Sequence, residues 1–368
     1  MVPGPDCDSH LKRASHLADT LTLSSDRGAR AAHLHAPNTL CNTSRLTADG
    51  EHRQLRPSHR LVARRLAKYT APESSVFRGM MSEGCRLELE WDEEADDGSA
   101  ISAAAPPLPS SAFYKRVSMG DLQHARAKAL AAPLKLARDV RSYSVESAFL
   151  GSAGCAALGD FLLPSGVHVA RAYHVERRPC ESELIESRFA MLLTDFSPAD
   201  GWRQSGMLSA AEARAALGAL ARFHGFFWEG SDVWRGSEAA SELEEAVWSA
   251  GGYWQPSMQP EDQWAQLPQK WTQHYTSFGA AFADAPELAH IDLPTLGERL
   301  QAVATELAAL AHPFDSKAGG DAAANRKHRT IIHGDPKSAN LFLRDGTSVG
   351  ALELGLIDFQ WSGMLTRN

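Results

Sequence analysis

Residues 331–343 read Ile-Ile-His-Gly-Asp-Pro-Lys-Ser-Ala-Asn-Leu-Phe-Leu, and residues 356–360 read Leu-Ile-Asp-Phe-Gln. The first stretch ends in the apolar run Leu341–Leu343, and a second apolar run, Leu352–Ile357, leads into the other stretch; the turn dipeptide Asp345-Gly346 lies between the two runs. Apolar runs that flank such a dipeptide are typical of an antiparallel hairpin. The sequence therefore predicts two paired strands near the end of the chain.

Three polar residues lie at the open end of this hairpin. Asn340 comes just before the first strand, Asp358 comes just after the second, and Asp335 lies in the turn that leads into the pair. Because an antiparallel pair brings these two ends together, their side chains should converge. One amide oxygen and two carboxylates suit a hard cation such as Mg²⁺.

The spacing of these residues is that of the catalytic and metal loops of kinases, namely His-x-Asp-x-x-x-x-Asn followed by a strand pair and Asp-Phe. The form His-Gly-Asp with Ile-Asp-Phe-Gln resembles the aminoglycoside phosphotransferase and choline kinase superfamily, and within it the ecdysteroid-kinase-like (CHK kinase-like) branch. This resemblance implies that Asp335 is the catalytic base and that Asn340 and Asp358 bind Mg²⁺. It implies that His333 braces the catalytic loop, and that ATP donates a phosphate to a small-molecule alcohol.

The same resemblance implies an α+β fold with two lobes, like that of protein kinases. We expect a poorly ordered extension over residues 1–60, a small mixed β-sheet lobe over 61–195 and a larger, mainly helical lobe over 196–368. The chain ends ten residues after Asp358, where relatives continue with further helices. We therefore expect the second lobe to be incomplete at its C-terminal end.

A lysine and a glutamate further upstream fit the same scheme. Residues Ala112–Val117 read as a short strand that carries Lys115, and a helical stretch from about Val140 carries Glu146 among apolar neighbours. A lysine there can simply face solvent from an edge strand. In a kinase it would hold the α- and β-phosphates and would need a glutamate to orient it. An unpaired carboxylate in apolar surroundings is unfavourable, so Glu146 is the expected partner.

Two glycines and a connecting segment are the remaining candidates for nucleotide contacts. Gly79 and Gly84 lie in a turn before the alternating strand Cys85–Trp91, and glycine lets backbone N–H groups approach phosphate. An ordinary hairpin turn explains them equally well. Leu193 and Asp195 lie at and just after the end of a predicted strand over residues 188–194. This segment resembles the connection between kinase lobes, which meets adenine through backbone groups.

Other stretches predict supporting structure. We expect a basic helix over residues 58–69, one strand over 167–174, and a helix that starts at the capping box Ser209–Glu212. His224 lies on the apolar face of that helix and reads as a core histidine. A later stretch contains five tryptophans, which can bind a cationic amine but more often fill a loose core. They are Trp234, Trp248, Trp254, Trp264 and Trp271.

Composition narrows the class of protein. The 368 residues carry a net charge of −8, which argues against general affinity for nucleic acid. An odd number of cysteines, five, without a Cys-x-x-Cys pair suggests a reducing compartment and no zinc site. No apolar run approaches the roughly 18 residues of a membrane span. We therefore expect a cytoplasmic protein; the many acids near the N-terminus argue against an organellar targeting peptide, although they leave one open.

Two other functions compete with a small-molecule kinase. A catalytically impaired relative could keep the fold as a binding module, and the short C-terminal end favours that reading. A metal-dependent phosphohydrolase could use His333 and Asp335, but such enzymes need further His, Asp and Asn motifs upstream, and none is recognisable here. The identity of the acceptor alcohol and the oligomeric state are not readable from the sequence.

Overall fold

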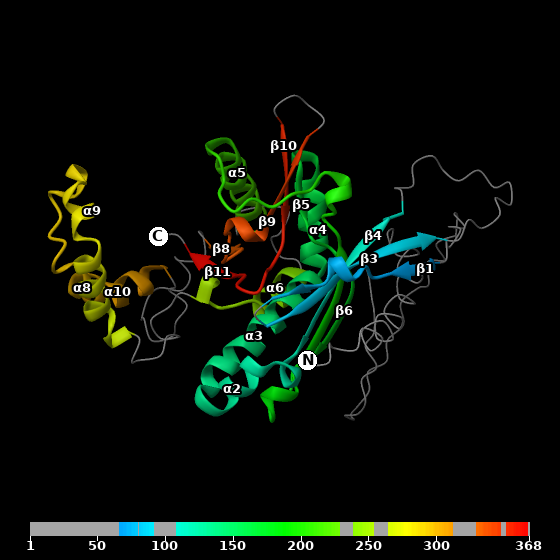
Figure 1. Ribbon diagram of the computed structural model, residues 1–368, viewed down its shortest axis with the longest axis horizontal. Coiled ribbons are helices and arrows are strands. Elements are labelled where there is room, and N and C mark those ends of the chain that lie inside the picture. Colours follow the sequence, from blue (N-terminus) through cyan, green and yellow to red (C-terminus); the bar gives the residue numbers. More distant parts are fainter. Residues whose placement is uncertain are drawn as a thin grey trace, which may run out of the picture.

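The structure is a computed structural model that describes residues 66–79, 81–91, 108–228, 238–253, 264–311, 329–346 and 351–366. The predicted extension over residues 1–60 lies outside this part of the chain. Figure 1 shows a twisted sheet and its helices on one side of the molecule, and the hairpin of the C-terminal region beside them.

The larger sheet has the strand order β1-β3-β4-β7-β6, with β2 paired to β3, and every pairing in it is antiparallel. Its strands are β1 (Leu66–Thr70), β2 (Phe77–Arg78), β3 (Glu83–Trp91), β4 (Ser111–Ser118), β6 (Ala172–Arg178) and β7 (Arg188–Thr194). The inner strand β7, between β4 and β6, is buried over five consecutive residues because both faces of the sheet are covered there. Strand β4, which carries Lys115, lies directly beside it.

Three helices follow the first strands. They are α2 (Gln123–Ala131), α3 (Pro133–Leu150) and α4 (Ala153–Leu162). Helix α3 begins with proline at its first position, where no backbone N–H is needed, and it buries ten side chains against the sheet and the core. This helix carries Glu146 beneath the sheet.

The C-terminal region forms two small sheets. Strand β5 (Val167–Val169) pairs in parallel with β10 (Leu352–Leu356), which pairs antiparallel with β9 (Leu341–Asp345), and β8 (Arg329–Ile332) pairs with β11 (Gly363–Thr366). The predicted hairpin is therefore present, with Leu356 opposite Leu341.

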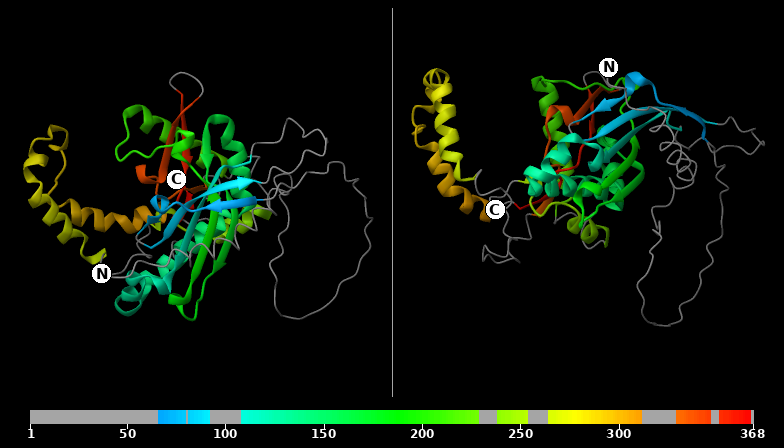
Figure 2. Two further views of the ribbon diagram at one scale, coloured as in Figure 1. Left: turned by 45° about the vertical axis from the view of Figure 1, so that its right-hand side comes forward. Right: turned by 60° about the horizontal axis from the view of Figure 1, so that its bottom comes forward.

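The remaining helices are α5 (Ala210–Phe226), α6 (Glu238–Ala246), α8 (Leu267–Ser277), α9 (Gly279–Ala283) and α10 (Leu296–Ala311). Short 3₁₀ turns cover 73–75, 119–121, 163–165, 184–186, 198–200, 251–253, 286–288 and 338–340. The predicted capping box at Ser209 and Glu212 is present at the start of α5. In Figures 1 and 2, α8, α9 and α10 form an arm that projects away from the rest of the molecule.

One large hydrophobic core joins the larger sheet and its helices to the two small sheets of the C-terminal region. It includes Phe149 of α3, Met191 of β7, Phe223 of α5, Leu356 of β10 and Phe359. Because strands and helices from both halves of the sequence share this core, the helix that carries Glu146 and the catalytic hairpin are held together by packing.

Two predictions of local structure were wrong. Residues 66–69 belong to strand β1 rather than to a helix, because β1 pairs with β3 and aligns Lys68 with Glu90 across the two strands; residues 58–65 lie outside the described part. Residues 167–174 form two strands in different sheets instead of one, with β5 joining β10 and β6 joining β7.

Among the described residues, no single helix is long and apolar enough to cross a bilayer. Only α3 and α4 taken together, across a bend of 61°, reach that length and composition.

Candidate active site

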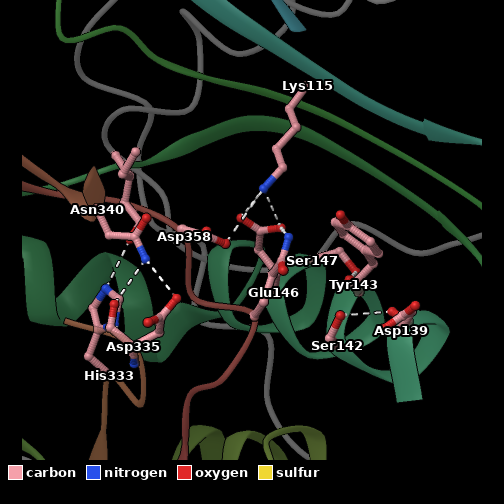
Figure 3. A network of polar contacts seen from close by, with 12 residues as sticks. Lys115, Asp139, Ser142, Tyr143, Glu146, Ser147, His333, Asp335, Asn340 and Asp358 are labelled. Atoms are coloured by element: carbon pink, nitrogen blue, oxygen red, sulfur yellow. Dashed lines mark hydrogen bonds and ion pairs between the residues drawn. The ribbon is translucent and has the colours of Figure 1, made fainter. Parts of the chain in front are cut away.

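The hairpin brings the predicted polar residues together. Asn340 ends the 3₁₀ turn before β9, Asp358 follows β10, and the N–H of Ile357 donates to the carbonyl of Asn340 at 3.2 Å. Figure 3 shows Asp335, Asn340 and Asp358 on the same side of the hairpin, with Lys115 reaching towards them from the larger sheet. Asp358 lies far from Lys115 in the sequence and approaches its ammonium group only through the fold, with Asp358 Oδ1 3.8 Å from that group.

His333 links the loop that precedes β9 to the residues that follow β10. Its Nε2 donates to the carbonyl of Ile357 at 2.9 Å, and its Nδ1 accepts the N–H of Asp335 at 3.3 Å. Burial lowers the pKa of His333, so the ring is neutral and can donate with one nitrogen while it accepts with the other. The position of His333 therefore supports the loop rather than the chemistry.

Gly334 must be glycine. Its φ is +83°, and a Cβ there would lie 1.9 Å from the carbonyl oxygen of Trp361. No side chain fits that space, and the backbone conformation itself favours glycine. The segment after Asp358 packs directly on the loop that carries Asp335, which accounts for the glycine of the His-Gly-Asp motif.

Asp335 has two neighbours that hold its carboxylate. The side-chain amide of Asn340 donates to Asp335 Oδ2 at 3.1 Å and to its backbone carbonyl at 2.9 Å. The ammonium of Lys337 donates to the same Oδ2. Because its amide nitrogen is engaged by Asp335, the amide oxygen of Asn340 is left for another partner.

Lys115 and Glu146 form a buried ion pair. The Lys115 ammonium donates to both carboxylate oxygens, at 2.7 and 2.8 Å, and the two side chains are only 13% and 2% exposed. Burial alone would lower the pKa of Lys115, but Glu146 and Asp358 outweigh it and raise that pKa, so the ammonium stays charged. The ion pair predicted from the sequence is thus present, while its role with phosphate stays a prediction.

Phe359 and Gln360, for which the sequence predicted no role, connect the Lys115–Glu146 pair and its helix to the hairpin. The Gln360 amide donates to Glu146 Oε2 at 3.4 Å and hydrogen-bonds the hydroxyl of Tyr143, one turn earlier on α3. Burial raises the pKa of Tyr143 to about 12, so its hydroxyl stays protonated. The ring of Phe359 stacks on Phe149 of the same helix at 4.6 Å. The residues that follow Asp358 therefore fix α3 and its glutamate.

Asp358 contrasts with Glu146, whose two carboxylate oxygens both accept from Lys115. The Oδ1 of Asp358 is buried and has no hydrogen-bond partner among the residues that the structure describes. Its backbone has φ 65°, a conformation that is uncommon for residues other than glycine and is tolerated best by Asn and Asp. A buried carboxylate oxygen without a partner is unfavourable, and strained residues gather at functional sites.

This geometry suits Mg²⁺. Asp358 Oδ1 and the amide oxygen of Asn340 are hard oxygen donors, and Mg²⁺ commonly binds one or two protein carboxylates together with water and substrate phosphates. No group of three or more His, Cys, Asp and Glu residues that could hold a metal occurs in the described parts of the chain. The residues present therefore fit a metal ion whose coordination is completed by a phosphate ligand.

The remaining predicted residues lie above or beside this centre. Gly79 lies in the turn between β2 and β3, whereas Gly84 lies inside β3, opposite Lys115. A Cβ on Gly84 would lie 2.7 Å from the ring of Phe113, so this glycine makes room for an aromatic ring within the sheet rather than shaping a loop.

Leu193 and Asp195 lie where the sequence predicted the segment between the lobes. The side chain of Leu193 is buried in the core. The Asp195 carboxylate is bound by Arg86, with Nη2 to Oδ1 at 3.2 Å, and by Ser111 at 2.8 Å. The side chain of Asp195 is therefore committed to protein contacts, and only backbone groups of this segment remain for a nucleotide.

The other histidine and the tryptophans have structural surroundings. His224 is largely buried, which lowers its pKa, and its carbonyl accepts the hydroxyl of Thr330 at 2.6 Å. The indole of Trp248 donates to the carbonyl of Gln360, and that of Trp271 to the carbonyl of Leu293. Trp234 and Trp254 lie outside the described residues.

Sequence reasoning missed Lys337, Gln360 and Arg86. Lys337 follows Asp335 by two positions, so its proximity could have been read from the motif itself. Arg86 could not have been found in that way, because it is 109 positions from Asp195.

A buried Lys–Glu pair above a hairpin that presents Asp, Asn and Asp defines a kinase-like phosphotransferase. In agreement, residues 143–364 match the phosphotransferase enzyme family (APH). The match covers more than half of the 368 residues, and the chain belongs to this family. No significant match to a curated protein or to a solved structure was found.

Proposed function

We propose that the protein transfers the γ-phosphate of ATP to the hydroxyl group of a small molecule, with Mg²⁺ as the metal ion. The observation that carries this proposal is Asp358 Oδ1, a buried carboxylate oxygen without a hydrogen-bond partner, 3.8 Å from the Lys115 ammonium. A cation beside it would satisfy that oxygen, and the phosphates of a nucleotide would meet both the cation and the ammonium.

Each residue of the site has a role in this proposal. Lys115, oriented by Glu146, would neutralise the charge of the α- and β-phosphates. Asn340 and Asp358 would hold Mg²⁺, which neutralises phosphate charge as the reaction proceeds. These residues supply positioning and charge rather than covalent chemistry.

Asp335 would accept the proton of the acceptor hydroxyl. The hydroxyl oxygen then forms a bond to the γ-phosphorus while the bond to the β–γ bridging oxygen breaks, and ADP leaves with that electron pair. Lys337 donates to the Asp335 carboxylate and keeps it oriented. In this position Lys337 would also reduce repulsion between that carboxylate and an incoming phosphate.

The phosphate acceptor is proposed only as a chemical class, an alcohol. The motif His-Gly-Asp with Asp-Phe-Gln favours the ecdysteroid-kinase-like branch, whose members phosphorylate alcohols. Trp271 of the projecting arm lies tilted against Phe282, with the ring centroids 5.9 Å apart, and such aromatic surface would suit an organic acceptor with an apolar part.

Turnover with a panel of alcohols tests this function. We expect ATP consumption that depends on one of the alcohols, and a loss of about 10²–10⁴-fold in kcat for Asp335→Asn. Asp345→Asn, at the opposite end of the same hairpin and exposed, is the matched control and should keep wild-type turnover. Full turnover of Asp335→Asn on a genuine acceptor would contradict the role of Asp335.

A further inference from the structure

A hollow of about 260 Å³ lies next to the segment that connects the two halves of the molecule. Thr194 and Phe196 of that segment line it, together with Arg171 between β5 and β6, Trp202 after the 3₁₀ turn at 198–200, and Arg344 of β9. None of Lys115, Asp335, Asn340 and Asp358 is among the lining residues. The hollow is thus separate from the catalytic centre, and its volume lies below the roughly 300–1,000 Å³ typical of sites for drug-sized ligands.

Two guanidinium groups and the carboxylate of Asp195 give this hollow its polar character, and Arg86 and Ser111 already neutralise and hold that carboxylate. Arg171 is paired with Asp160 at 2.6 Å, but their side chains are 42% and 74% exposed. Water therefore screens the attraction between the two charges, and the ion pair is weak. The guanidinium lies over Gly159 of α4, where a Cβ would come within 2.9 Å of its nitrogens. An incoming anion can therefore replace Asp160 on Arg171 at little expense.

The second guanidinium is held in place on an aromatic wall. Arg344 is bound to Glu353, with Nε to Oε2 at 3.1 Å, and lies 4.3 Å above the ring of Trp202. The rings of Phe196 and His168 meet the edge of Trp202 at 4.9 and 5.1 Å. Burial lowers the pKa of His168, so this ring adds aromatic surface rather than charge at neutral pH. Phe196 and Trp202 are only 7% and 5% exposed, so a small apolar ring in the hollow would meet the edges of these side chains rather than their faces.

A ligand in the hollow would touch the segment where the nucleotide is expected. The N–H of Thr194 donates to the carbonyl of Arg171 at 2.8 Å, and the hydroxyl of Thr194 accepts the N–H of Arg171 at 3.0 Å. The backbone of Arg171 is therefore fixed to the first residue of this segment. Movement of Arg171 on binding would be transmitted directly to Thr194.

We propose that this hollow is a second binding site, for a small planar aromatic carboxylate. The carboxylate binds the guanidinium fork of Arg171, which matches its geometry. The ligand's ring meets the exposed edges of Trp202 and Phe196 beside the charge of Arg344. A bound ligand would contact residues beside β6, in the connecting segment and in β9 at the same time. These contacts would stabilise the folded state. The proposal is independent of the identity of the phosphate acceptor.

Sodium benzoate is the probe, titrated up to about 10 mM while Tm is recorded on the full chain. We expect a saturable rise in Tm with wild type, and none with benzamide, which has the same shape without the charge. Arg171→Gln should weaken the apparent affinity about tenfold or more, because a charged hydrogen-bond partner is lost. Arg178→Gln, which removes an exposed arginine of β6 outside the hollow, should respond like wild type.

Gly159→Ala gives a second test that leaves Arg171 in the chain. Its methyl group would displace the guanidinium and should weaken benzoate binding as Arg171→Gln does. Asp358→Asn should keep the full response to benzoate, which separates this site from the phosphate site. The absence of a saturable rise in wild type, an equal response to benzamide, an unchanged affinity in both hollow variants, or loss of the response in Asp358→Asn would each overturn the proposal. Failure of ATP to bind would leave the benzoate result unaffected.

Discussion

Three carboxylates lie beside a cation from the larger sheet, and they differ in whether each of their oxygens has a hydrogen-bond donor. Asp195 receives Arg86 and Ser111, so both of its oxygens have donors and its side chain is only 4% exposed. Glu146 likewise receives both contacts of the Lys115 ammonium. Asp358, beside the same ammonium, keeps one buried oxygen without a hydrogen-bond partner in the described part of the chain.

The presence or absence of a donor for every carboxylate oxygen distinguishes a structural ion pair from a site that can bind a ligand. A carboxylate whose oxygens are all satisfied stabilises the fold and has nothing to offer a metal ion. A buried oxygen without a donor, on a residue with φ 65°, is unfavourable by itself and becomes favourable when a cation arrives. Charge and burial alone do not make this distinction, because Asp195 is buried and ionic as well.

Lys115→Met should have the larger effect on activity. It removes the ammonium that would meet phosphate and leaves Glu146 buried without its cation, and we expect kcat/KM for ATP to fall by about 10²-fold or more. Steady-state kinetics measure this change. Lys68→Met, which changes an exposed lysine of β1 that pairs with Glu90, is the control and should leave kcat/KM within a few-fold of wild type. An unchanged kcat/KM in Lys115→Met would place the phosphates elsewhere.

Asp195→Asn should affect stability rather than chemistry. Asparagine keeps the shape but takes the charge away from Arg86, so we expect a loss of about 1–3 kcal/mol in the free energy of unfolding. Urea unfolding measures this loss, and turnover measured well below the unfolding transition should remain close to that of wild type. A loss of turnover as large as that of Asp335→Asn would mean that the two carboxylates do not differ as proposed.

The smallest expected effect is a dependence of stability on acidic pH. His168, His224 and His333 each have a pKa that burial lowers from 6.5. The unfolded chain therefore binds protons first as the pH falls below about 6.5, and the folded state loses stability until the lowered pKa values are passed.

Tm measured from about pH 7.5 down to about pH 5.5 should fall. His333→Gln should reduce the slope, although it starts from a lower Tm, whereas His290→Gln at an exposed position should leave the slope unchanged. A Tm that rises on acidification would contradict neutral buried histidines.

The hairpin was predictable from the sequence because its information is local. Apolar runs, a turn dipeptide and the spacing from His333 to Asn340 lie within a short stretch, and pairing geometry then places Asp358 beside Asn340. The Lys115–Glu146 pair could be inferred because a buried glutamate needs a cation. Its formation still depends on α3 packing beneath β4 and β7, which distant core residues determine.

The predictions of local structure that were wrong concern segments whose pairing partners lie far away in the chain. Residues 66–69 carry basic and apolar residues compatible with a helix, but β3 offers them an edge to pair with. Residues 167–174 look like one strand until β10, almost two hundred positions later, takes the first half. The partners of Asp195 and the space around Gly84 were invisible for the same reason.

The most direct test of the unsatisfied oxygen is the change in Tm caused by ATP with and without Mg²⁺, measured on wild type and on Asp358→Asn. We predict a rise in Tm with wild type that requires Mg²⁺, and no Mg²⁺-dependent rise with Asp358→Asn, while Asp345→Asn behaves like wild type. An equal Mg²⁺-dependent rise in wild type and Asp358→Asn would contradict the assignment of metal and nucleotide to this hairpin.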